Sequence, residues 1–344
     1  MNNALRRFLL NNSWRLCWKI VSWLASAFIW IVLLVSGLWA FGALWFDFPL
    51  ASLTSVAASG FAVGFALVLA FIRPWWRAKL GLALTIAIVV GWWFTQQACQ
   101  YRDWKPEVLL TPYATIEGEV VTMHNVRNFD YRSEEDFTPR YEVRHLDLRN
   151  LRGLDIFITY WGSPYMAHPI LSFDFGPDGR VCFSIETRPV RGQAYSAIGG
   201  LYRQFELAYI VADERDVIRV RTNFRKGEDV YLYRVNEPLV KTIFMEYVRT
   251  VNELHETPRW YNAITDNCTS AIRHQRSASD RPPWDWRMLV NGFGDELLYE
   301  RGALDRSLPF AELKQRAHIN ERAHAANDAP DFSQRIRVGM PPTQ

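Results

Sequence analysis

HPILSFDFGPDGRVCFSIETR, residues 168–188, contains two runs rich in Phe, Ile and Val that flank the turn sequence Gly-Pro-Asp-Gly at 176–179. In such a turn Pro presets its own φ, Asp tolerates the next position, and Gly accepts a positive φ. Short apolar runs on either side of a turn signal are typical of paired strands. The stretch therefore predicts a β-hairpin.

The two-residue period of a strand sorts the hairpin side chains onto two faces. The apolar face receives Leu171, Phe173, Phe175, Val181, Phe183 and Ile185. The opposite face receives His168, Ile170, Ser172, Asp174, Cys182, Ser184 and Glu186. His168 and Glu186 are then opposed or diagonal neighbours, and cross-strand neighbours lie within reach of a hydrogen bond. The pattern predicts their common face, whereas it leaves their contact open.

Further elements surround the hairpin in an order that indicates an α+β domain. The apolar patterning predicts strands at residues 116–123, 141–147, 154–161, 217–222 and 230–235. Residues 125–140 are polar and predict a long loop, and residues 238–255 predict an amphipathic helix. We expect one thiol-enzyme domain at 117–319, after a connector at 98–116, with a loose polar tail at 320–344.

The first 97 residues have the composition of a membrane anchor. Three uncharged apolar runs occupy residues 20–46, 52–72 and 80–97, and each is about the length of a spanning helix, roughly 20 residues. The first is too long for a signal-peptide core and lacks a small-residue cleavage site, so we expect it to be retained. The third run is also compatible with a buried helix of a soluble domain.

Basic residues near the ends of these runs predict the orientation of the anchor. The loop at 47–51 has none, whereas basic residues precede the first run and separate the second from the third: Arg6, Arg7, Arg15, Lys19, Arg73, Arg77 and Lys79. We therefore expect a cytoplasmic N-terminus and three passes through a bacterial inner membrane, with the C-terminal domain in the periplasm. The net charge of +3 comes without a basic, aromatic-interleaved patch, so no nucleic-acid partner is predicted.

Four cysteines are present, and three of them follow the apolar runs: Cys99, Cys182 and Cys268. Thiols outside the cytoplasm tend to form disulfides, but an odd number leaves at least one free. The chain has no Cys-x-x-Cys and no His-Glu-x-x-His sequence, so neither a metal site nor a cofactor is expected. Whether Cys99 and Cys182 pair is left open.

Cys268 lies in ITDNCTSAIRHQ, residues 264–275, where a polar loop meets a predicted helix starting at Thr269. A helix N-terminus favours thiolate over thiol, and its backbone N–H groups can hold an oxyanion. His168 can take the thiol proton while Glu186 orients the imidazole. The alternative is that Cys268 is a buried structural thiol or forms a disulfide with Cys99 or Cys182.

Alternatives also exist for the other two candidates. His124 and His145 flank the polar loop and are not dismissed by spacing, and His255 is a further possibility. His274 follows Cys268 on the same predicted helix but on a different face, which makes it a poor base. Glu186 can equally be half of a surface ion pair.

Three motifs together resemble the Lnb N-terminal periplasmic domain family: Ala-His at 167–168, Ser-x-Glu-x-Arg at 184–188 and Tyr-Asn-x-x-x-x-Asn-Cys at 261–268. The resemblance implies a permuted papain-like fold of the NlpC type, in which an antiparallel sheet is accompanied by a nucleophile-bearing helix. It implies Cys268 as nucleophile, His168 as base and Glu186 as orienting group. Tyr261, Asn262 and Asn267 match the motif around the cysteine, either to position the loop or to line the oxyanion and acyl pocket.

The resemblance also implies a reaction, because family members of named activity are lipoprotein N-acyltransferases. A phospholipid would donate an acyl chain to Cys268, and the amino terminus of a lipoprotein would accept it. The three leading helices of this chain depart from those acyltransferases, so two other functions stay open. One is an NlpC-type amidase or peptidase acting on peptidoglycan peptides, and the other is a catalytically silent envelope-binding domain. The Trp- and Tyr-rich flank (Trp260, Tyr261, Trp284, Trp286) suits an acyl groove or a core.

Overall fold

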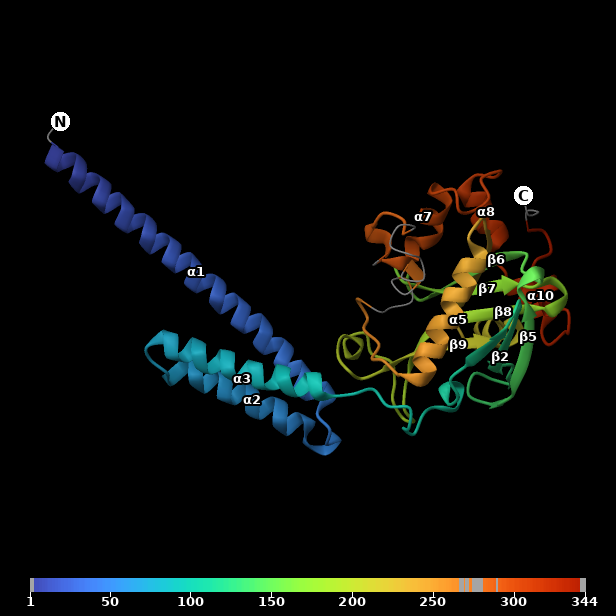
Figure 1. The fold of residues 1–344 in the computed structure, drawn as a ribbon, viewed down its shortest axis with the longest axis horizontal. Helices are drawn as coiled ribbons and strands as arrows, with labels where there is room; N and C mark the ends of the chain where they lie inside the picture. Colours follow the sequence, from blue (N-terminus) through green and yellow to red (C-terminus); the bar gives the residue numbers. More distant parts are fainter. Residues whose placement is uncertain (1–2, 266–268, 270–271, 274–280, 289, 341–344) are drawn as a thin grey trace. The chain divides into compact units, whose positions relative to one another are not determined.

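The computed structural model describes residues 3–265, 269, 272–273, 281–288 and 290–340. Figure 1 shows the chain, which divides into two compact units. The first comprises residues 1–97 with 202–204, and the second comprises residues 98–201 with 205–344. Each unit is described by itself.

The first unit is built from three helices, α1 (Asn3–Asp47), α2 (Thr54–Phe71) and α3 (Trp75–Thr95). The segments Trp14–Asp47, Thr54–Phe71 and Trp75–Thr95 are long and apolar enough to cross a membrane. Many of their large side chains are exposed, such as Trp18 and Trp23, while small residues such as Ala40, Ala43 and Ala58 are buried. Small residues at helix contacts are typical of membrane bundles. The prediction of three apolar helices is confirmed, with α1 beginning before its uncharged run.

The second unit is organised around one large sheet, with strand order β1-β2-β9-β8-β7-β6-β10 and β5 paired to β2. Its strands are β1 (Tyr113–Glu117), β2 (Val120–Arg127), β5 (Tyr141–Asp147), β6 (Gly153–Trp161), β7 (Ala167–Asp174), β8 (Arg180–Arg188), β9 (Glu206–Ala212) and β10 (Glu228–Val235). Neighbouring strands of the described sheet pair antiparallel, except that β2 and β9 meet in a parallel pair at Arg127↔Ala212. A separate small hairpin joins β3 (Asp130–Tyr131) and β4 (Phe137–Thr138).

The predicted hairpin is formed by β7 and β8, with Leu171 opposite Phe183 and Ser172 opposite Cys182. Gly179 closes the turn at φ +89°, a conformation that glycine adopts without steric cost. Phe173 and Phe183 pack against Phe244 of α5 (Val240–Glu256), which lies over this face of the sheet (Figure 1). The predicted α+β class and the sorting of the hairpin faces are confirmed.

The remaining helices are short. They are α4 (Glu214–Val217), a π-helix (Val220–Phe224), α7 (Gly294–Glu300), α8 (Phe310–Ala317), α9 (Asn320–Ala326) and α10 (Phe332–Arg335). Residues of α4, α9 and α10 share a buried cluster with Phe157, Ile170 and Cys182 on the face of the sheet opposite α5. Val220 of the π-helix belongs to a separate cluster with Phe129 and Tyr131. The helix predicted to carry Cys268 lies outside the described residues, apart from isolated positions.

Three segments differ from the sequence predictions. Residues 217–222 are helical rather than a strand, because the side chain of Asp213 caps α4 by accepting from the backbone N–H of Arg215. Residues 116–123 are split into β1 and β2 by Gly118 at φ +61°. Residues 320–340 are not a loose tail, since Ala323, Phe332 and Ile336 are buried in α9, α10 and the turn that follows.

Candidate active site

His168 and Glu186 face each other from neighbouring strands. The register Ile170↔Ser184 places His168 on β7 beside Glu186 on β8. Nε2 of His168 lies 3.1 Å from Oε1 of Glu186, and His168 is only 8% exposed. The contact that the sequence left open is therefore present in the structure.

Ser184 joins the two groups and identifies which imidazole nitrogen carries a proton. Its Oγ lies 2.8 Å from Nε2 of His168 and donates to Oε1 of Glu186 at 2.6 Å. Because the hydroxyl proton goes to the carboxylate, Oγ must accept from an Nε2–H group. Nδ1 is then the nitrogen through which His168 can take up a further proton.

Arg221 of the π-helix is a second cation in contact with the Glu186 carboxylate. Its Nη2 donates to Oε1 of Glu186 at 2.8 Å, and its Nη1 lies 3.4 Å from Glu228. Burial alone would raise the pKa of Glu186, but the charges of His168 and Arg221 hold that pKa well below its usual value. Glu186 is therefore ionised at neutral pH and can stabilise an imidazolium at His168. Sequence reasoning missed Arg221 because it fell within a predicted strand.

Asn291 connects the two ends of the proposed catalytic pair. Its Oδ1 accepts from the backbone N–H of Ala167 at 2.9 Å, and its Nδ2 donates to Oγ1 of Thr269 at 3.2 Å. Ala167 precedes His168 in the chain, and Thr269 follows Cys268. One side chain thus ties the backbone beside the histidine to the residue beside the cysteine.

Gly292 allows the segment that carries Asn291 to lie close enough to Ala167 for these hydrogen bonds. Its backbone N–H donates to the carbonyl of Tyr165 at 3.1 Å, and its carbonyl accepts from the hydroxyl of Tyr160 at 2.9 Å. A Cβ at Gly292 would lie 2.1 Å from the carbonyl oxygen of Pro164, so glycine is required for this approach. The Asn-Gly dipeptide was the only signal in the sequence for this contact, and it is equally a common turn sequence.

Tyr261 and Asn262, predicted to shape or line the pocket, occupy different environments. Tyr261 is 8% exposed, belongs to the main core, and donates its backbone N–H to Phe205. Oδ1 of Asn262 accepts from the backbone N–H groups of Ile264 and Thr265. Such a turn fixes the loop leading to the cysteine, which favours the positioning role. Asn267 and Cys268 lie outside the described residues.

The other cysteines and histidines that follow the three apolar runs have environments of their own. Cys99 and Cys182 are free thiols, and burial raises the pKa of Cys182, which keeps it protonated and unreactive. His124 on β2 stacks on Tyr113, and β9 and β8 separate β2 from β7. His145 and His255 bind Thr122 and Thr111, respectively. His274 lies outside the described residues.

Exposed apolar side chains lie close to the segment that holds Asn291. Tyr165, Met166, Trp284 and Trp286 are each between 47% and 63% exposed. Phe293 contacts both Tyr165 and Trp286, with ring centroids 5.9 and 5.6 Å apart. We call Tyr165, Met166 and Trp286 the apolar rim. Among the described residues, no group of three or more His, Cys, Asp or Glu side chains could hold a metal ion.

The fold and the helices define an α+β domain associated with a membrane through three apolar helices. Residues 137–292 match the family described as the Lnb N-terminal periplasmic domain. This match agrees with the family that the motifs indicated. A periplasmic domain of this kind and three apolar helices fit an inner-membrane protein. No curated protein and no solved structure matches the chain. The permuted papain-like arrangement stays an implication of the resemblance.

Proposed function

We propose that the protein is a membrane-anchored periplasmic cysteine enzyme that transfers acyl groups through a thioester on Cys268. The observation that carries this proposal is the buried contact of 3.1 Å between His168 Nε2 and Glu186 Oε1. An imidazole held by an ionised carboxylate is the arrangement that a thiol nucleophile needs for its proton. The N-terminus would be cytoplasmic, as the basic residues predict.

The first half-reaction forms the thioester. Nδ1 of His168 takes the thiol proton of Cys268, and the thiolate attacks the carbonyl carbon of a phospholipid ester. Glu186 stabilises the imidazolium that results. When the tetrahedral intermediate collapses, the carbon–oxygen ester bond breaks and the imidazolium returns the proton to the leaving alkoxide. The products are the acyl thioester and a lysophospholipid.

The second half-reaction regenerates the thiol. An amine, in our proposal the amino terminus of a lipoprotein, attacks the thioester carbonyl. His168 accepts a proton from the attacking nitrogen and donates it to the sulfur as the carbon–sulfur bond breaks. An amide and a free Cys268 are formed, so atoms and charge balance without a cofactor.

The apolar rim supports a lipid as the acyl donor. Tyr165 is 59% exposed and Met166 47% exposed, and both precede His168 by no more than three residues. Aromatic side chains with one polar end are suited to a membrane–water interface. A site for a purely polar peptidoglycan peptide has no need of such side chains, which is why the amidase reading ranks second.

The test is the intact mass of the detergent-solubilised protein after incubation with phospholipid. We expect an acyl adduct that hydroxylamine removes from the wild type and that is absent from Cys268→Ala and His168→Ala. If no adduct forms while a thiol-reactive probe still labels Cys268 in a His168-dependent manner, an amidase or peptidase is favoured. If labelling is indifferent to His168, the proposed arrangement is wrong and the domain is better explained as a binder.

A further inference from the structure

The outer edge of β10 is open over a short stretch. The backbone N–H of Val230 donates to the side chain of Asn320, its carbonyl accepts from Ile319, and the N–H of Asn236 donates to Ala303. Backbone groups alternate sides along a strand, so residues 230, 232, 234 and 236 all point away from β6. Within the part of the chain that the structure covers, Leu232 and Arg234 have no hydrogen-bond partner for their outward N–H and C=O groups.

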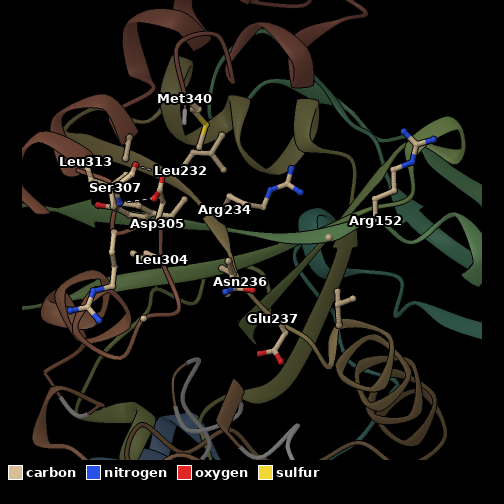
Figure 2. A pocket seen from close by; sticks show the side chains of 17 residues that line it. Arg152, Leu232, Arg234, Asn236, Glu237, Leu304, Asp305, Ser307, Leu313 and Met340 are labelled. Carbon is tan, nitrogen blue, oxygen red and sulfur yellow. Dashed lines mark hydrogen bonds between the residues drawn. The ribbon is translucent and has the colours of Figure 1, made fainter. Parts of the chain in front are cut away.

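This open stretch lies in a pocket. A cavity of about 560 Å³ is lined by Leu232 and Arg234 together with the 302–307 segment, α8 and Met340. Figure 2 shows Arg234 and Asn236 in the middle of the pocket, with Leu304 and Leu313 to one side and Met340 above. Unpaired groups at a sheet edge usually lie open to bulk solvent or under a covering element, whereas here they lie in a walled recess between two capped ends.

The geometry points to a docking site for an extended peptide that adds to β10 as a further strand. Only a peptide backbone offers N–H and C=O groups at the spacing that Leu232 and Arg234 present. Side chains of an added strand alternate between the two walls. One wall is apolar, made by Leu304, Leu313 and Ala317.

The charges around the recess favour acidic side chains at the alternate positions. The lining contains three arginines, of which Arg234 already pairs with Asp155 at 2.5 Å. Among the described residues, Arg152 and Arg306 have no carboxylate partner. Of the two carboxylates in the lining, Glu237 already accepts from the backbone N–H of Leu239. Asp305 already accepts from the backbone and the hydroxyl of Ser307. The partner is therefore an extended segment in which apolar and acidic residues alternate. This binding function is separate from the proposed thiol chemistry, since no residue of the recess belongs to the His168 site.

Fluorescence polarisation of the full-length protein in detergent tests the proposal, with a labelled pentapeptide in which leucine alternates with glutamate as the probe. Two further peptides have the same sequence. In one, the backbone amides of the odd-numbered residues are N-methylated, and in the other those of the even-numbered residues. Only one set of amides of an added strand faces β10, so we expect one methylated peptide to lose at least about tenfold in affinity, roughly 1.4 kcal/mol, and the other to bind like the parent. Lysine in place of glutamate should weaken binding.

Ser307, which is exposed at the recess, provides the matched protein variants. Ser307→Trp should fill the recess and weaken the parent peptide by at least about tenfold, whereas Ser307→Ala should leave its affinity unchanged. The proposal is overturned if the parent peptide does not bind, if the two methylated peptides bind equally well, or if Ser307→Trp binds like the wild type. Thioester formation is measured separately and bears on neither outcome.

Discussion

Arg221 donates to Oε1 of Glu186 at 2.8 Å, and the same oxygen lies 3.1 Å from Nε2 of His168. One carboxylate is thus shared between a guanidinium and an imidazole. The imidazole and the guanidinium together hold the pKa of Glu186 well below its usual value, and the ionised carboxylate in turn favours the charged form of His168. Arg221 is a positioning residue in this arrangement, because it acts on the base through Glu186.

Arg221→Gln should shift the pH dependence of the cysteine. Removing one of the two cations that hold down the pKa of Glu186 raises that pKa. Glu186 is then protonated at a higher pH and stops supporting the imidazolium, so the acid limb of Cys268 reactivity should move to higher pH. The measurement is the rate of iodoacetamide alkylation of Cys268 against pH, followed by mass spectrometry.

Arg225→Gln is the control for this shift. Arg225 also pairs with Glu228, at 3.4 Å, but among the described residues it makes no ion pair with Glu186. Its acid limb should coincide with that of the wild type. An unshifted limb in Arg221→Gln would instead show that Glu186 does not act on His168.

Asn291→Ala should slow thiol chemistry more than it lowers stability. The variant removes both hydrogen bonds that tie Ala167 to Thr269. A displacement of reacting groups by about 1 Å costs on the order of a hundredfold in rate, so a loss of tenfold to a hundredfold is expected. Thr269→Val removes only the bond between Asn291 and Thr269 and should have a smaller effect.

The double variant with His168→Ala separates positioning from general damage. If Asn291 acts by holding the histidine beside the cysteine, adding Asn291→Ala to His168→Ala should cause little further loss of alkylation rate. Additive losses would mean that Asn291 supports the fold in some other way.

Gly292→Ala and Gly294→Ala form a matched pair. A methyl group at Gly292 would lie 2.1 Å from the carbonyl oxygen of Pro164 and 2.5 Å from the carbonyl carbon of Tyr165, whereas at Gly294 nothing lies within 4 Å. Overpacking against backbone typically costs 1 to 3 kcal/mol, so we expect Gly292→Ala to lose about 2 kcal/mol of stability. Thermal unfolding and the alkylation rate should both worsen for Gly292→Ala and stay near wild type for Gly294→Ala.

Trp286→Ser should distinguish lipid access from chemistry. Trp286 is 53% exposed in the apolar rim, so losing it should reduce acyl-adduct formation from phospholipid vesicles without changing alkylation by water-soluble iodoacetamide. Val143→Ser is the control, since Val143 is equally exposed but lies on β5. Parallel losses in both assays would contradict a lipid-contact role for the rim.

The sequence predicted the hairpin and the shared face of His168 and Glu186 because both follow from a two-residue period around one turn. Arg221 and Asn291 were out of reach, since each reaches the hairpin from a distant segment without regular periodicity. A π-helix and a short turn leave no pattern that singles out one residue. Tertiary contacts of this kind become visible only when the segments are placed in space.

The mistaken strand at residues 217–222 has a specific physical cause. Apolar and basic residues alternate there, which predicts a strand with one buried face. The preceding acidic residues decide the outcome instead: Asp213 caps a helical turn, and Asp216 forms a buried pair with Arg127 at 2.8 Å. The helix cap and the ion pair outweighed the local alternation. Neither interaction leaves a periodic pattern in the sequence, so the prediction could not include them.

The predicted loose tail was wrong for a related reason, and its contacts give a test of acid stability. Arg337 pairs with Glu214 at 2.6 Å and Asp155 at 2.7 Å, and both carboxylates are buried. Burial alone would raise the pKa of Glu214, but Arg337 lowers it to about 2. The polar sequence of the C-terminal segment does not indicate that Arg337 pairs with two buried carboxylates.

The sign of the pH dependence follows from this shift. An unfolded Glu has a pKa near 4.3, so the folded-state pKa of Glu214 is depressed. Its contribution to stability is then present above about pH 4.3 and is lost as the pH falls towards 2. A difference of roughly two units corresponds to about 3 kcal/mol.

Glu214→Gln should therefore lower the free energy of unfolding by about 3 kcal/mol at neutral pH and flatten its decline below about pH 4.3. Glu312→Gln is the control, because Glu312 pairs with Arg316 on the surface, and such pairs contribute no more than about 1 kcal/mol. The measurement is urea unfolding of the detergent-solubilised protein at several pH values. If Glu214→Gln and the wild type lose stability in parallel on acidification, the buried pair with Arg337 does not anchor the C-terminal segment, and its order must come from Phe332 and Ile336 alone.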